Sequence, residues 1–151
     1  RWGGPPAAVA ICYEISNGAA LARAVADGAE WILAAANLDP YPRLLQQQYS
    51  ALAQLRSLET ARPLLSTANT GPTAMIRANG QVAQRLASFD PGLLVVPFQP
   101  RKGLTGYVRW GEAPLLLIIG ASSLMLIKSA SRSGPRPARP RRRKTPPLDQ
   151  A

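Results

Sequence analysis

Two short apolar runs that flank a helical segment constrain the fold of this chain most strongly. Residues 7–13 (AAVAICY) and residues 31–36 (WILAAA) each predict a buried strand. Between them, Asn17 is placed to cap the start of a helix, and Gly28 follows the point where that helix should end. A strand, a helix and a second strand in this order are typical of α/β proteins with a layered sheet.

The next part of the chain continues the same pattern. A proline-containing loop at residues 37–43 precedes a predicted amphipathic helix at 44–61. The apolar face of this helix is expected to carry Leu44, Leu45, Leu52, Leu55 and Leu58. Further strands are predicted at residues 64–68, 73–77 and 93–98, and Asn79-Gly80 is a strong hairpin dipeptide. The fold class indicated is therefore α/β.

A third apolar run lies closer to the C-terminus. Residues 113–127 are 15 uncharged, mostly apolar residues between Glu112 and Lys128. A membrane-spanning helix needs roughly 20 such residues, so the length is borderline. Because Lys128 can extend its ammonium group towards the membrane surface, we expect a transmembrane helix over residues 112–130. The alternative is a helix buried in a protein core.

The remaining residues, 131–151, are rich in proline and arginine and are expected to form a disordered basic tail. Of the 18 lysines and arginines in the chain, 8 lie in residues 128–151, which contain 1 acidic residue. A basic cluster directly after an apolar helix is typical of the cytoplasmic flank of a membrane span. We therefore expect anionic lipid, and not nucleic acid, to be the partner of this tail.

The side chains that are absent exclude several kinds of chemistry. The chain has no histidine, which excludes Ser-His-Asp and Cys-His catalysis and histidine-ligated metal sites within these residues. A single cysteine excludes an intrachain disulfide and a thiolate zinc cluster. We expect neither a metal nor a cofactor.

Cys12 is the strongest candidate nucleophile, although a lone cysteine at the end of a strand is more often a small buried apolar residue. Alternation along a strand would place Glu14 on the same side as Cys12. A carboxylate beside a thiol disfavours the thiolate, so Glu14 could not activate Cys12 without a nearby cation or another base. No such group is identifiable from this sequence.

Several motifs together carry a family resemblance. Residues 10–15 (AICYEI), 28–33 (GAEWIL), 55–71 (LRSLETARPLLSTANTG) and 103–111 (GLTGYVRWG) resemble, in order and spacing, the C-terminal part of the apolipoprotein N-acyltransferases. That family is an integral-membrane branch of the nitrilase, or carbon-nitrogen hydrolase, superfamily. The resemblance implies that residues 1–111 form the C-terminal part of a nitrilase-like αββα domain, on the periplasmic side of a bacterial inner membrane, with the C-terminal tail in the cytoplasm.

The same resemblance implies an enzyme and assigns roles. Cys12 would accept an acyl chain from a phospholipid as a thioester and pass it to the amino group of a diacylglyceryl-cysteine on an apolipoprotein, with Glu14 in a supporting role. Tyr13, Asn37 and Tyr41 are expected to bind substrate. The general base Glu and the Lys of the family precede the cysteine, so we expect an incomplete piece that is inactive alone and belongs to a monomeric protein.

The chain also departs from the family pattern near the expected substrate entrance. Where the family usually has Ser-Asn-Asp, this chain keeps only the asparagine, as Asn37. On the long helix, the usual His, Gln and Arg of the family are replaced by Tyr49, Ala51 and Gln54. Two alternatives therefore remain. One is an amidase or nitrilase of the same superfamily that passes its acyl group to water. The other is a non-catalytic membrane relative whose tail binds lipid or nucleic acid.

Overall fold

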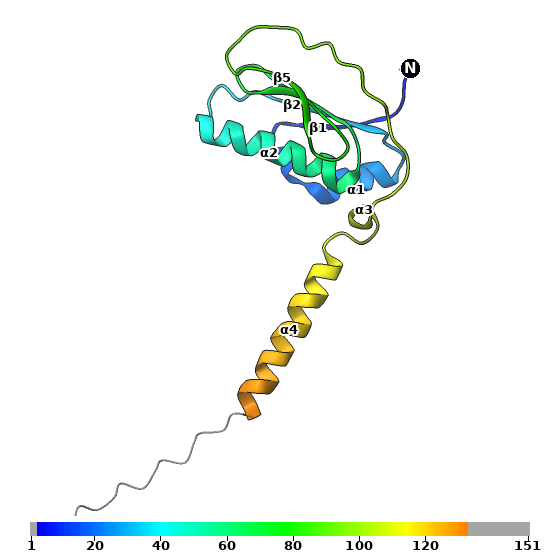
Figure 1. Ribbon diagram of the computed structural model, residues 1–151, viewed down its shortest axis with the longest axis vertical. Coiled ribbons are helices and arrows are strands. Elements are labelled where there is room, and N and C mark those ends of the chain that lie inside the picture. The colour runs from blue at the N-terminus through cyan, green and yellow to red at the C-terminus, as the bar shows by residue number, and fades with distance from the viewer. Residues whose placement is uncertain (1–2, 133–151) are drawn as a thin grey trace, which may run out of the picture. The chain divides into compact units, whose positions relative to one another are not determined.

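The computed structural model describes residues 3–132, and it contains a mixed five-stranded sheet (Figure 1). The strands lie in the order β1-β2-β3-β4-β5. The first three run parallel, whereas β3, β4 and β5 pair antiparallel. Their bounds are Ala7–Ile11 for β1, Trp31–Ala36 for β2, Leu64–Ala68 for β3, Thr73–Ile76 for β4 and Val82–Leu86 for β5. The predicted α/β fold class is confirmed.

Helices of the first part of the chain cover one side of this sheet. A 3₁₀ helix, η1, spans Cys12–Ser16, and α1 spans Gly18–Ala26, where the side chain of Asn17 accepts a hydrogen bond from the amide of Ala20 as predicted for a cap. Helix α2 spans Arg43–Thr60 and α3 spans Gly106–Trp110. Figure 1 shows α1 and α2 on the same side of the sheet.

The two faces of β1 differ in burial. Ala8 and Ala10 are buried in the core that the sheet shares with α1 and α2. Val9 and Ile11 point to the opposite face and are 55% and 63% exposed. The sheet therefore presents apolar side chains on the face that α1 and α2 leave open.

Parallel pairing sets the position of the segments that leave the strands. Ile11 pairs with Ala35, and Ala36 pairs with Ala68. The carboxyl ends of β1, β2 and β3 therefore meet at one edge of the sheet. The residues that follow these strands come together there, as they do at the ligand sites of other parallel sheets.

The orientation of α2 differs from the prediction. Four of its five leucines are exposed, and only Leu52 packs against the core. The buried face instead carries Gln46, Tyr49, Ala53, Arg56, Ser57 and Thr60. Polar side chains turn inward because they bind backbone groups: the Ser57 hydroxyl lies 2.6 Å from the carbonyl oxygen of Arg62 and 2.7 Å from that of Arg77. The face of α2 that carries the leucines was predicted to be buried, and this prediction is therefore wrong.

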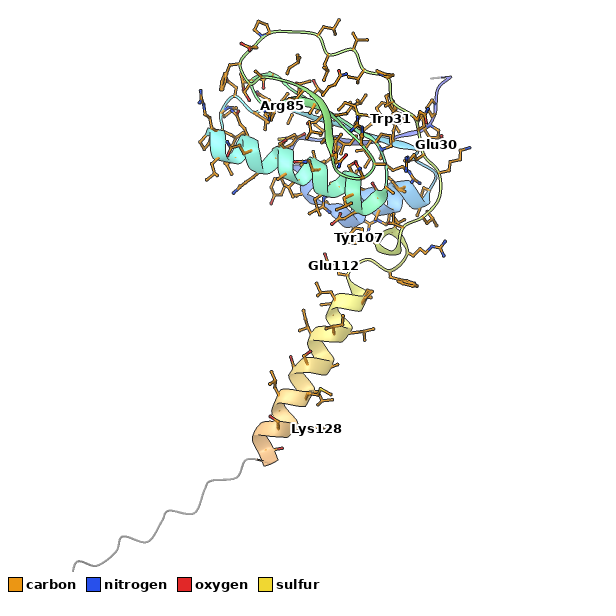
Figure 2. All side chains as sticks on the ribbon, viewed as in Figure 1. Glu30, Trp31, Arg85, Tyr107, Glu112 and Lys128 are labelled. Atoms are coloured by element: carbon orange, nitrogen blue, oxygen red, sulfur yellow. The ribbon has the colours of Figure 1, made fainter. Side chains whose placement is uncertain are left out.

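The predicted strand at residues 93–98 is wrong, and β5 takes its place as the last strand. The Asn79-Gly80 turn joins β4 to β5, with Gly80 at φ +80°. Residues 93–98 contain Pro97, which has no amide hydrogen to donate to a neighbouring strand. The segment instead returns beside β2, where the Phe98 ring lies 5.2 Å from the Trp31 ring and the Arg101 amide donates to Glu30 (Figure 2).

The described residues divide into two units, with the boundary between Ala113 and Pro114. Helix α4 spans Ala113–Arg132, but no helix within the described residues is long and apolar enough to cross a membrane, so the expected transmembrane helix at 112–130 is not found. Its uncharged run of 15 residues is shorter than the roughly 20 that a span needs. The helix includes residues 131 and 132 of the predicted tail, and the rest of that prediction lies outside the described residues.

The orientation of α2 can be tested with one substitution made at two positions. Ala53 is fully buried, whereas Ala51 is exposed two residues away on the same helix. Ala53→Leu should lower the free energy of unfolding by about 1–3 kcal/mol because it overpacks the core. Ala51→Leu should change it by no more than about 0.5 kcal/mol. Chemical denaturation of the full-length protein measures both, and equal effects would contradict the observed orientation.

Candidate functional site

Cys12 occupies a strained turn at the carboxyl end of β1. The strand ends at Ile11, and Cys12 is the first residue of η1. Its φ of +54° lies in the left-handed region, which residues with a side chain rarely adopt. The thiol is partly exposed. Strain of this kind persists only where surrounding contacts maintain it, and it is concentrated at functional sites.

Glu14 supplies one of those contacts. Its carboxylate accepts a hydrogen bond of 2.8 Å from the amide of Ile11, the residue immediately before Cys12. The turn is closed further by the Asn17 amide, which donates to the carbonyl oxygen of Glu14, and by the Ser16 hydroxyl, which donates to that of Tyr13. The strand alternation that was expected to put Glu14 and Cys12 on the same side does not apply, because the strand ends at Ile11 and both residues lie in η1.

Three hollows border Cys12. The α1 hollow, about 580 Å³, lies between β1, η1 and α1 and includes Tyr13 and Glu14. The strand-end hollow, about 400 Å³, lies at the carboxyl ends of the parallel strands and includes Asn37 and Asn69. The apolar hollow, about 200 Å³, lies between η1, α2 and the loop after β2. It is lined by Cys12, Tyr13, Ile15, Leu38, Tyr41, Leu45, Gln48, Tyr49 and Leu52.

Each residue predicted for the site lies in a hollow that Cys12 also lines. Tyr13, which is 82% exposed, borders both the α1 hollow and the apolar hollow. Tyr41 borders the apolar hollow and Asn37 the strand-end hollow. Glu14 borders the α1 hollow. The parallel strands and the turn after β1 thus place these side chains around one thiol.

Asn69 and Gln46 hold the loop after β2 in place, although neither was predicted to be a site residue. The Asn69 side-chain amide donates to Oδ1 of Asn37 at 2.7 Å, and its own oxygen accepts from the Leu38 amide at 2.9 Å. Gln46, buried on α2, donates to the carbonyl oxygens of Leu38 and Tyr41. Asn69 lies in the quoted Asn-Thr-Gly motif, but nothing in the sequence indicates that it contacts Asn37.

Tyr49 is a further residue of the site that was not selected by sequence. Its side chain is 7% exposed, and its hydroxyl is buried with no hydrogen-bond partner among the described residues. Burial, and then the charge of the Cys12 thiolate, raise the pKa of Tyr49 to about 12. The hydroxyl therefore keeps its proton at neutral pH and remains a donor. The family resemblance already placed Tyr49 near the expected substrate entrance, but the burial of its hydroxyl appears only in the structure.

The residues around Cys12 provide few charges. Within the described part of the chain, no lysine or arginine lines any of the three hollows, and no group of three or more acidic or cysteine side chains could hold a metal ion. Cys12 thus has a positioned turn, an apolar hollow and hydrogen-bonding side chains around it. Apart from Glu14, whose carboxylate is bound to the Ile11 amide, no base or cation that would promote thiolate formation is among the described lining residues.

Comparison with known proteins finds one matching family model and several similar relatives. A family model described as carbon-nitrogen hydrolase matches residues 3–102. An apolipoprotein N-acyltransferase of Prochlorococcus marinus (strain MIT 9313) is 63% identical over 116 residues, covering 77% of this chain and 23% of that protein. One of Bordetella bronchiseptica is 39% identical over 137 residues, covering 86% of this chain and 24% of that protein. The chain thus spans about a quarter of the length of these relatives.

A solved structure shares the fold. A mutant form of the amidase from Nesterenkonia sp. AN1, a member of the nitrilase superfamily, matches with a TM-score of 0.55 at 24% identity. The match covers 76% of this chain and 45% of that one. In that structure acrylamide has undergone Michael addition at the active-site cysteine of the amidase. At this identity the similarity shows a nitrilase-like α/β fold.

The contact between Glu14 and Ile11 gives a stability prediction. Glu14→Ala should lower the free energy of unfolding by about 1 kcal/mol, because the Ile11 amide loses an acceptor comparable to a helix cap. Glu14→Gln keeps an acceptor oxygen and should recover most of the loss. Thermal unfolding of the full-length protein measures both variants. Equal stability of the alanine variant and the unmodified protein would show that the bond does not support the turn.

The left-handed conformation of Cys12 gives a second prediction. Cys12→Gly should be more stable than Cys12→Ala by about 1 kcal/mol, because glycine adopts positive φ without steric cost. If the backbone at residue 12 were unstrained, the alanine variant would be the more stable of the two, since glycine loses more conformational freedom on folding. Chemical denaturation of the two variants distinguishes these cases. A more stable alanine variant would mean that the turn carries no strain.

Proposed function

This chain belongs to the carbon-nitrogen hydrolase family, and from that premise we propose that it forms part of an apolipoprotein N-acyltransferase with Cys12 as the nucleophile. The observation that carries the proposal is the placement of Cys12, at a strained turn and beside a hollow whose lining is mostly apolar. Such a hollow suits a lipid acyl chain better than a small polar amide. The 63% identity to the Prochlorococcus acyltransferase supports the same assignment.

The proposed reaction has two transfers through one sulfur atom. The Cys12 thiolate attacks the ester carbonyl carbon of a phospholipid. A carbon-sulfur bond forms, the ester carbon-oxygen bond breaks, and the glycerol oxygen leaves with a proton as a lysophospholipid. The amino group of a diacylglyceryl-cysteine then attacks the thioester carbonyl, so that an amide forms, the carbon-sulfur bond breaks and the amine gives up a proton. Covalent catalysis of this kind divides one difficult step into two easier ones.

The described residues fit supporting roles in this scheme. Glu14 holds the turn that presents the thiol, through its bond to the amide of Ile11. Tyr13, Asn37 and Tyr41, which share hollows with Cys12, would contact the two substrates. The general base and the cation that the scheme also requires are assigned to parts of the protein other than the described lining of the hollows.

The fold of the complete catalytic domain is proposed to be an αββα sandwich. Its support is the open face of the sheet, where Val9 and Ile11 expose apolar side chains that a second sheet would cover. Both proposed substrates are lipids or lipid-anchored, so the domain is placed at the bacterial inner membrane, on its periplasmic side.

A second candidate function is hydrolysis of an amide, with water as the acceptor of the acyl group. The observation that favours it is the structural similarity to the Nesterenkonia amidase. The two functions differ in the acceptor. An acyltransferase yields an N-acylated lipopeptide, whereas an amidase releases a free carboxylic acid and ammonia.

One assay tests the nucleophile and separates the two functions. The full-length protein, supplied with phospholipid and a diacylglyceryl-cysteine peptide, should produce N-acylated peptide. Cys12→Ser should lower the rate by several orders of magnitude while the protein stays folded, because a hydroxyl is far less ionised than a thiol. Mass spectrometry of the peptide gives the rate, and circular dichroism monitors folding. Transfer retained by the serine variant would refute the assignment of Cys12, and release of free fatty acid without acylated peptide would show that water, and not the lipopeptide, accepts the acyl group.

A further inference from the structure

The apolar hollow beside Cys12 contains one polar group whose bonding is incomplete. Ile15, Leu38, Leu45 and Leu52 supply most of its aliphatic surface. Tyr49 lines the same hollow from α2, and its buried hydroxyl has no partner in the described part of the chain. A buried hydroxyl without a partner is unfavourable, because it has lost its hydrogen bonds to water and gained none. A bound molecule with an acceptor atom would remove this penalty.

The other tyrosines of the hollow differ from Tyr49. Tyr13 and Tyr41 are 82% and 43% exposed, so water can bind their hydroxyl groups. Tyr49 and Cys12 line the same apolar hollow. The charge of the Cys12 thiolate also contributes to the raised pKa of Tyr49. Tyr49 is thus a buried donor near the nucleophile, in surroundings that favour an apolar ligand.

We propose that the Tyr49 hydroxyl donates a hydrogen bond to the carbonyl oxygen of an acyl group that binds in the apolar hollow beside Cys12. Tyr49 is then a specificity-determining residue that selects acyl compounds, which combine an apolar chain with one acceptor oxygen. An alkyl group without a carbonyl would fill the hollow and leave the hydroxyl unpaired. This inference rests on the proposed function and adds to it the residue that recognises the acyl carbonyl.

The protonation state of Tyr49 supports this role. With its pKa raised to about 12, the phenol is neutral at physiological pH and donates without carrying charge. A neutral donor suits an apolar hollow, since a charged group there would be strongly disfavoured. A neutral ester or thioester carbonyl is the matching acceptor.

The test compares two thiol reagents that carry the same apolar chain. N-Octylacrylamide reacts by Michael addition: the sulfur bonds to the terminal alkene carbon, the π bond breaks and a proton joins the neighbouring carbon. 1-Iodooctane reacts by displacement, with a carbon-sulfur bond formed and iodide released. Only the first reagent has a carbonyl oxygen. Rate constants for modification of Cys12 are measured by mass spectrometry in the full-length protein.

Tyr49→Phe removes the hydroxyl and keeps the ring. It should lower the rate constant for N-octylacrylamide roughly tenfold, the effect of one lost hydrogen bond, and leave that for 1-iodooctane unchanged. The thermal unfolding temperature should not fall, because no partner among the described residues loses a bond. Tyr107→Phe is the matched control. Tyr107 lies on α3 (Figure 2), its hydroxyl is near Gly18, and it is not among the residues that line the three hollows. Its substitution should change neither rate constant.

Two results would overturn the inference. One is an unchanged rate constant for N-octylacrylamide in Tyr49→Phe, and the other is an equal fall for both reagents, which would indicate altered packing. The outcome is separable from the proposed function, because neither reagent requires acyl transfer. Suppose that the unmodified protein fails to acylate the lipopeptide, but Tyr49→Phe lowers the rate constant for N-octylacrylamide and not that for 1-iodooctane. The acyltransferase proposal then fails, and the role of Tyr49 stands.

Discussion

The parallel pairing of β1, β2 and β3 is the constraint on which the rest of the site depends. Because Ile11 pairs with Ala35 and Ala36 pairs with Ala68, the three strands end at one edge of the sheet. Cys12 follows the first strand directly, and the loops after the other two are joined there by the bond between Asn37 and Asn69. A shift of register by one residue would reverse every side chain of a strand and separate these groups.

Local signals in the sequence predicted much of this arrangement. Strand β2, strand β3 and α2 formed at or within one residue of their expected ranges, since apolar runs, prolines and turn dipeptides act over short distances. The buried face of α2 was not predicted, because Gln46 and Ser57 turn inward to bind backbone carbonyl groups outside the helix. Tyr49 was expected near the substrate entrance, but its burial could not be predicted, because tertiary packing creates its environment.

The departures from regular structure lie beside the thiol. The strand that was expected to continue through Tyr13 ends at Ile11, and the chain enters a 3₁₀ helix through the left-handed conformation of Cys12. No residue pattern predicts this turn, since cysteine has no preference for positive φ. The turn moves the thiol out of the sheet to a position bordered by three hollows, and Glu14 stabilises it by binding the preceding amide. A buried strand-end cysteine would instead be inert.

The central claim is that Cys12 carries an acyl group during the reaction. The most direct measurement is mass spectrometry of peptides from the full-length protein after brief exposure to a phospholipid with an isotopically labelled acyl chain and no lipopeptide acceptor. The account predicts that the peptide containing Cys12 gains the mass of one acyl group, and that hydroxylamine removes it as expected for a thioester. A labelled acyl group on another residue, or lipopeptide acylation without any acyl-Cys12, would contradict it.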